Sequence, residues 1–252
     1  MNRQTKWMLG MLALLATLAL TATSCAKLQA RDNLNKGVRA FRDAHYENAV
    51  KYFQQAVQLD PDLTTAEIYL GTAYAQQYVP NGRGEENKKN AEMAIKTFED
   101  VLQRDGTNVN AIAGLASIYQ NLGQEDTKNL QKAHDYYLKY ASLDDKNPVP
   151  YYAIGSLNWL IVYDKNHPPA EEEQGKLIDE GLQNLDKALS LNPDYDDAMT
   201  YKNLLYREKA RLAGTEDDKK KLTDMADEWF NKAIETRKKN AEKKKAIPVG
   251  NN

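Results

Sequence analysis

The chain has 252 residues, of which 28% are charged and 9% are aromatic, and its formal net charge at pH 7 is −2. This composition excludes a chain that is mainly disordered and a chain that is embedded in a membrane throughout. The sequence pI of about 6.0 argues weakly against nucleic acid as the main partner, because nucleic-acid-binding domains usually carry a basic surface.

The N-terminus has the layout of a secretion signal. Arg3 and Lys6 precede the uncharged run "WMLGMLALLATLAL", and the small residues of "TATSC" follow it. This run is short for a membrane-spanning helix, which needs roughly 20 apolar residues. We therefore expect residues 1–24 to be a signal peptide that is cleaved from the mature protein.

The single cysteine, Cys25, stands where the cut is expected. The segment "ATSC" resembles the lipobox of bacterial lipoproteins, although Ala22 stands where that family favours Leu. The resemblance implies lipidation of Cys25 and anchoring to the bacterial cell envelope; the alternative is an ordinary signal with an incidental cysteine. Ala26 in place of Asp implies, by resemblance to proteobacterial sorting, the outer membrane facing the periplasm. A lipidated Cys25 leaves no cysteine for a disulfide bond.

The first repeat follows, in "LNKGVRAFRDAHYENAVKYFQQAVQLDPD". It resembles the tetratricopeptide repeat, a helix–turn–helix of about 34 residues. Gly37 lies in the expected first helix, where it faces Ala49 of the second and lets the two axes approach. Phe53 shares the face of Ala49, and Pro61 ends the second helix.

The pattern recurs along the chain with insertions. The closing segments "LDPD", "RDGT", "LDDK" and "LNPD" recur farther apart than one repeat length, so each later repeat holds an insertion. We expect the repeats at 30–63, 64–108, 109–147, 148–195 and 196–236. Tyr140 and Asn203 depart from the family's small residues, so wider or rotated helix contacts are expected at those two positions.

The predicted fold is all-α: a right-handed superhelical tetratricopeptide solenoid of about five repeats, or about ten helices, with loops inserted within the repeats. Residues 25–29 would form a short linker after the lipidated cysteine, and residues 237–252 a basic, frayed tail that could also touch anionic lipid. The segments "NPDYDDAMTYKNLLYREKA" and "QQYVPNGRGEEN" resemble uncharacterised acidobacterial members of the family.

In tetratricopeptide proteins the first helix of each repeat lines a groove, and the resemblance implies a groove here. Arginine and aromatic side chains would anchor a partner, while Asn and Gln would hydrogen-bond its backbone. The alternative is that Phe41 and Trp159 pack under neighbouring helices. The candidate groove residues are Arg31, Phe41, Arg42, Gln76, Asn110, Gln120, Asn121, Tyr152, Trp159 and Arg207.

The inserted segments are "QQYVPNGRGEENKKN", "GQEDTKN", "YDKNHPPAEEEQGK" and "LAGTEDDKKK". In a solenoid such insertions gather along one edge. They are either surface elaboration and lengthened helices, or an edge that contacts a partner.

The sequence shows no pattern typical of catalysis or of metal or cofactor binding. His45, His134 and His167 lack a partner at metal-ligand spacing, and there is no phosphate-binding loop or nucleophile elbow. We therefore expect no enzyme and no cofactor, but a scaffold that binds a protein or peptide by its groove and loop edge. The alternatives are a self-associating solenoid, an assembly or pilotin-type lipoprotein of an outer-membrane complex, and an enzyme with a site in the inserted loops.

Overall fold

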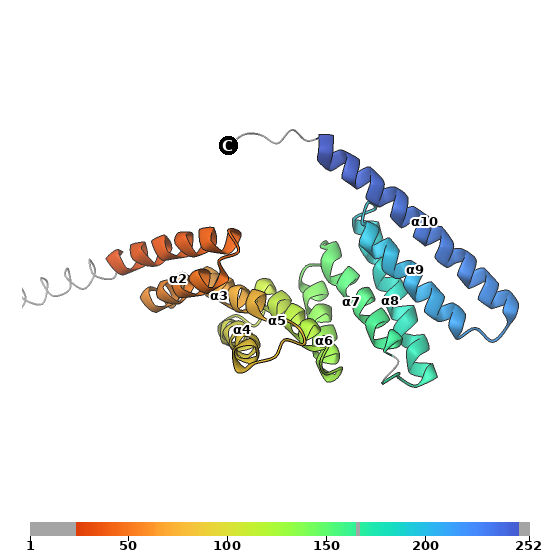
Figure 1. Ribbon diagram of the computed structural model, residues 1–252, viewed down its shortest axis with the longest axis horizontal. Helices are drawn as coiled ribbons and strands as arrows, with labels where there is room; N and C mark the ends of the chain where they lie inside the picture. The colour runs from red at the N-terminus through yellow and green to blue at the C-terminus, as the bar shows by residue number, and fades with distance from the viewer. Residues whose placement is uncertain (1–23, 165–166, 247–252) are drawn as a thin grey trace, which may run out of the picture. The chain divides into compact units, whose positions relative to one another are not determined.

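The computed structural model describes residues 24–164 and 167–246 (Figure 1). Helices joined by short turns make up this part of the chain, and it contains no strand. All but the last residue of the expected signal peptide, and the last six residues of the expected tail, lie outside the described residues. Within the described part, no helix combines the length and the apolar character that crossing a bilayer requires.

The helices form five consecutive pairs, which confirms the predicted all-α solenoid of about ten helices. A first helix over residues 24–42 precedes the labelled helices of Figure 1. The pairs are residues 24–42 with α2 (Tyr46–Leu59), α3 (Thr64–Gln77) with α4 (Glu85–Arg104), α5 (Val109–Leu122) with α6 (Lys128–Leu143), α7 (Pro148–Tyr163) with α8 (Glu171–Leu191), and α9 (Asp196–Arg211) with α10 (Glu216–Ala246).

The chain divides into two compact units within α5. The N-terminal unit ends at Ile118 and holds the first helix, α2, α3, α4 and most of α5. The C-terminal unit begins at Tyr119 and holds the end of α5 and α6 to α10.

Aromatic rings fill glycine notches in the N-terminal unit. The ring of Phe53 lies against Gly37, and the ring of Phe98 lies against both Gly71 and Gly114. A Cβ atom added at Gly114 would lie 2.4 Å from the Phe98 ring, which is too close for any real contact. Glycine is therefore required at this crossing so that the ring can be buried.

The expected contact of Gly37 with Ala49 is thus refined, because the atoms nearest to a Cβ at Gly37 all belong to Phe53, one turn further along α2. Ala49 is nevertheless fully buried. Ala49 leaves room for the helices to approach, and Phe53 fills the notch at Gly37.

Leucines take the place of the rings in the C-terminal unit. Leu185 of α8 lies against Gly155, and Leu205 of α9 lies against Gly181. A Cβ at Gly155 would lie 3.1 Å from the backbone oxygen of Gly181, so α7 and α8 approach each other backbone to backbone. This close approach offsets the cost of a glycine inside α8, which is about 1 kcal/mol relative to Ala.

In the last pair, α9 and α10, polar side chains stand where earlier pairs have a glycine notch. Asn203 is buried and accepts a hydrogen bond from Nε of Arg207 at 2.9 Å. Lys202 is also buried; its Nζ pairs with Asp186 of α8 and lies 3.8 Å from the centre of the Trp229 ring of α10. A charged side chain at this depth needs such partners.

Two expected segments differ from the structure. Residues 25–29, expected as a linker, belong to the first helix, and residues 237–246, expected as a frayed tail, form the last turns of α10. The inserted segments largely lengthen the second helices, since α4, α8 and α10 have 20, 21 and 31 residues against 14 in α2. Acidic side chains at the start of α9 form ion pairs with residues of this helical segment.

Candidate functional site

The most distinctive surface of the C-terminal unit is a set of partly exposed aromatic side chains on α7 and α9. We call it the aromatic stripe, and it consists of Tyr152, Trp159 and Tyr163 of α7 with Tyr201 of α9 and Tyr195 at the N-cap of α9. No residue from Pro148 to Tyr163 is charged. Spacings of seven and four residues place the three α7 side chains on one helical face.

The rings of the aromatic stripe form a chain of contacts. The Tyr152 ring lies 4.8 Å from that of Tyr195 and 5.7 Å from that of Tyr201, measured between centroids. The Trp159 ring lies 5.6 Å from Tyr201 and stacks on Tyr163 at 4.9 Å. On one side these rings pack on the core of the unit, while Tyr163 remains 47% exposed. The stripe therefore packs on the core along one side and presents Tyr163 to solvent.

The hydroxyl groups of Tyr152, Tyr195 and Tyr201 stay protonated at physiological pH, because their pKa values are raised. Burial, with the Tyr201 hydroxyl and the Asp197 carboxylate nearby, raises the pKa of Tyr152. Burial and the carboxylates of Asp197 and Asp196 raise the pKa of Tyr195 to about 12. The stripe thus offers neutral hydroxyl donors beside apolar ring faces.

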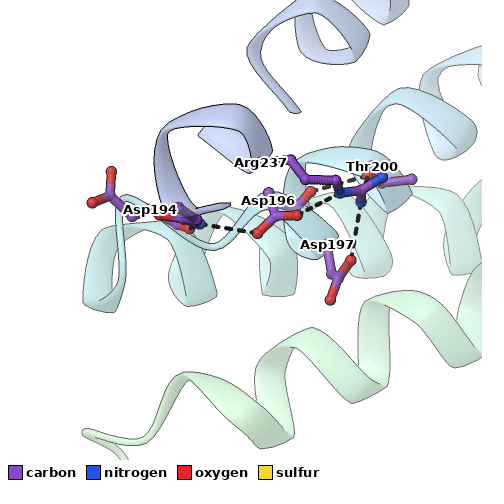
Figure 2. A network of polar contacts seen from close by, with 6 residues as sticks. Asp194, Asp196, Asp197, Thr200 and Arg237 are labelled. Carbon is purple, nitrogen blue, oxygen red and sulfur yellow. Dashed lines mark hydrogen bonds and ion pairs between the residues drawn. The ribbon is translucent and has the colours of Figure 1, made fainter. Parts of the chain in front are cut away.

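Next to the stripe, the start of α9 is tied to the end of α10 by an acidic clasp. Figure 2 shows the Arg237 guanidinium between Asp196 and Asp197, beside Thr200. Nε of Arg237 donates to Asp196 at 2.8 Å, and Nη2 donates to Asp197 at 3.2 Å. Two lysines add to this arrangement, so the acidic clasp comprises Asp194, Asp196, Asp197, Arg237, Lys239 and Lys243.

The clasp favours ionised carboxylates. Nζ of Lys243 and Nζ of Lys239 donate to Asp194 at 2.8 and 3.0 Å, and these bonds hold the pKa of Asp194 below its usual range. Burial opposes ionisation of Asp196, yet hydrogen bonds from Arg237 and Asn240 keep its pKa lowered as well. Arg237, Lys239 and Lys243 are therefore engaged within the protein.

The candidate groove residues of the N-terminal unit take different positions. The ring of Phe41 packs 5.3 Å from Tyr46 and 6.3 Å from Tyr69, so it is partly buried between neighbouring helices. The polar candidates remain exposed; they are Arg31, Arg42, Gln76 and Asn110.

The candidates of the C-terminal unit divide into two groups. Gln120 accepts a hydrogen bond from the Tyr137 hydroxyl at 2.8 Å, and Asn121 is half-buried. Arg207 bridges Asn203 and, at 2.7 Å, Asp227 of α10, so its guanidinium joins α9 to α10. Only Tyr152 and Trp159 belong to the aromatic stripe.

Sequence reasoning missed Tyr163, Tyr195 and Tyr201 of the stripe. The signal for Tyr163 was its position four residues after Trp159 on an uncharged helix. The other two come from the next repeat, and their approach to α7 requires the pairing of first helices from neighbouring repeats.

A surface pocket of about 510 Å³ lies where α8, α9 and the start of α10 meet. Apolar side chains from Ile178, Leu212, Leu222 and Met225 line it, and an ion pair of Lys209 with Asp179 at 2.6 Å stands at its side. Part of its lining comes from the inserted segment that joins α9 to α10. The insertion thus shapes this edge of the unit.

One histidine takes part in a buried polar network. His134 Nε2 of α6 lies 3.2 Å from the Glu180 carboxylate of α8, which also accepts from Asn158 of α7 at 2.9 Å. The network joins three helices. Within residues 24–164 and 167–246, no group of three His, Cys, Asp or Glu side chains could hold a metal ion.

Two family models match parts of the chain. The tetratricopeptide repeat model matches residues 34–63. The model of the plant-specific mitochondrial import receptor subunit TOM20 matches residues 167–252. No curated protein matches the chain.

Solved structures match most of the chain at low sequence identity. MamA (41–end) from Desulfovibrio magneticus RS-1 is 16% identical, with a TM-score of 0.59 over 84% of this chain and 96% of that chain. TTC0263, a thermophilic tetratricopeptide protein of Thermus thermophilus, is 16% identical, with a TM-score of 0.52 over 84% and 97%. YrrB, described as a tetratricopeptide protein with an unusual peptide-binding site, is 16% identical, with a TM-score of 0.52 over 82% and 90%.

At these identities the likeness concerns the fold. It agrees with the glycine notches, the five helix pairs and the match of the repeat model. The chain therefore has the all-α fold of a tetratricopeptide solenoid.

Proposed function

We propose that this protein is a non-catalytic scaffold that binds a protein or peptide partner through the aromatic stripe. The observation that carries the proposal is an uncharged helix, α7, whose Trp159 and Tyr163 stack on each other beside Tyr201. Tyrosine and tryptophan dominate the energetics of protein interfaces, because they bury a large area with few rotatable bonds.

The chemistry of the stripe favours a partner segment with apolar or aromatic side chains. Ring faces would pack on these side chains, and the neutral tyrosine hydroxyls would donate to backbone carbonyls of an extended segment. Because α7 has no charge, we expect the binding to depend weakly on salt. The peptide-binding site of YrrB supports the view that this fold can carry such a site.

The stripe is testable by site-specific photo-crosslinking in the native host. A benzoylphenylalanine placed at position 163 should capture a defined partner, whereas the same probe at Val79, an exposed side chain of the N-terminal unit, should not. Trp159→Ala should abolish capture from position 163. Equal capture from both positions, or capture that survives Trp159→Ala, would contradict the proposal.

We also propose that the scaffold is anchored to the bacterial envelope, at the outer membrane, by a lipid on Cys25. The motif "ATSC" after an apolar run supports this view, and Cys25 is exposed at the start of the first helix. Metabolic labelling with an alkyne fatty acid should mark the protein, and Cys25→Ser should remove the label and release the protein from membranes. A label that persists in Cys25→Ser would refute the lipid anchor and leave the stripe untouched.

A further inference from the structure

The outer face of α10 differs from the same face of the earlier second helices. In each second helix a large apolar or aromatic side chain follows a small residue by four positions; the small residues are Ala49, Ala94, Ala133, Gly181 and Ala226. In the first four repeats this large side chain is buried, but in the last it is half exposed. The exposed fractions are 0% for Phe53, 1% for Phe98, 7% for Tyr137, 0% for Leu185 and 48% for Phe230.

The exposure of Phe230 has a structural cause. Phe98 is buried between Gly71 of its own repeat and Gly114 of the next one. Asn203 stands at the position of Gly71 in the last repeat, and the described residues contain no first helix after α10. Within the described residues, Phe230 therefore lacks both surfaces that bury Phe98.

Ile234, one turn after Phe230 on the same face, is also exposed, by 51%. Two large apolar side chains thus stand together on the exposed face of α10. Their flanks are charged: Asp227 lies one turn before Phe230, and Lys238 lies one turn after Ile234. Lys238 is exposed and makes no ion pair within the described part of the chain.

We propose that this end face of α10, formed by Asp227, Phe230, Ile234 and Lys238, binds the same face of a second copy of the chain. If two α10 helices cross antiparallel about a two-fold axis near residue 232, Phe230 lies opposite Ile234 of the other copy. The same axis brings Asp227 opposite Lys238, so each acidic side chain meets a basic one. In this arrangement the apolar side chains meet apolar ones and the charged side chains meet opposite charges, so the face is complementary to itself, as a two-fold contact requires.

The alternative contact, in which α10 receives the first helix of another copy, is less complementary. The exposed side chains of the first helix include Lys27, Arg31, Asp32, Lys36 and Arg39, and Leu28 is its one large apolar side chain with high exposure. Such a polar face would leave Phe230 and Ile234 without apolar partners. The end face of α10 therefore favours a closed pair rather than a growing filament.

The expected dimer is weak. One helix crossing buries less than the ~800 Å² per partner of a standard protein interface. We therefore expect a reversible equilibrium with a dissociation constant of about 1–100 μM.

The test is sedimentation velocity of the full chain in excess detergent micelles, from low to high micromolar concentration. Phe230→Ser combined with Ile234→Ser should weaken the dimer about 100-fold or more, because two apolar side chains leave the interface. Leu138→Ser, which removes an apolar side chain that is 41% exposed on α6, should leave the equilibrium unchanged. Circular dichroism checks that each variant is folded.

A charge exchange provides the second, independent readout. Asp227→Lys and Lys238→Asp should each weaken the dimer about tenfold, and the two together should restore it. Asp227 also pairs with Arg207, but Lys238→Asp cannot restore that bond, so restoration reports the contact between copies. A chain that stays monomeric at the highest concentration, a dimer that survives both serine substitutions, or a double exchange as weak as the single ones would overturn the proposal.

Discussion

Phe98 and Phe230 occupy the same position in two repeats and have opposite environments. Phe98 sits in a notch between two glycines, whereas Phe230 faces outward from the last helix. The last pair holds together instead through Lys202, Arg207 and Arg237, which bind acidic or aromatic side chains of neighbouring helices. The neighbouring repeats, rather than the repeat pattern itself, therefore decide whether this side chain belongs to a core.

The largest expected effect separates these two phenylalanines. Phe98→Ala should lower the free energy of unfolding by about 3–5 kcal/mol, because it leaves a cavity between Gly71 and Gly114. Phe230→Ala should change it by about 0.5 kcal/mol or less when measured at a concentration where the chain is monomeric. Urea unfolding followed by circular dichroism measures both values, and equal losses would show that the two positions are equivalent after all.

The glycine notch is tested by adding a single methyl group. Gly114→Ala should destabilise the protein by about 1–3 kcal/mol, because its Cβ would meet the Phe98 ring at 2.4 Å. Gly175→Ala in α8 is the matched control, since a Cβ there meets nothing within 4 Å. The control should stabilise the protein by about 0.5–1 kcal/mol through helix propensity, as measured by thermal unfolding. If Gly114→Ala and Gly175→Ala changed the stability in the same direction, the notch at Gly114 would be refuted.

The polar contacts of the last pair should respond to charge and pH. Arg237→Gln should raise amide hydrogen exchange at residues 237–246 while leaving α7 unchanged, whereas Lys245→Gln, at an exposed position near the end of α10, should change neither region. The pKa values of Asp194 and Asp196 are lowered on folding, so the clasp stabilises α10 above the unfolded pKa of about 3.9. This stability is lost as the pH falls through the lower pKa values of the folded state. If amide hydrogen exchange at residues 237–246 responds neither to Arg237→Gln nor to a fall in pH, the clasp does not hold the end of α10.

The smallest expected effect is a loss of stability at alkaline pH. Burial raises the pKa of Tyr137 and that of Tyr195 to about 12, against an ordinary value of about 10. Their neutral forms therefore favour the folded state below about pH 10, and this contribution is lost as the pH rises towards 12. Tyrosinate absorbance should show late titration in the unchanged chain, and Tyr137→Phe and Tyr195→Phe should each remove part of it. Titration of all tyrosines near 10 would contradict the buried environment.

The repeat architecture could be predicted because it rests on local spacing. Gly37, Phe53 and Pro61 mark one helix pair, and the same spacing recurs in later repeats. The aromatic stripe could be predicted only in part, since Tyr195 and Tyr201 reach α7 from another repeat. Likewise, "RKKNAEKKK" has the composition of a solvated tail, and its pairing with "DYDD" depends on how far α10 extends along α9. Spacing along one helix reveals which face is apolar, but it does not reveal which distant charges that helix will meet.

The lengthened second helices have a practical consequence for engineering this protein. The glycine notches lie within the helices, whereas the additional turns of α4 and α8 lie towards the connections that precede them, and α10 is extended at both ends. A fluorescent label or an affinity peptide placed at Gly214 would enter an exposed connection, where an added Cβ meets no atom within 4 Å. Chain length can therefore change at such a connection while the alignment of the repeats is kept.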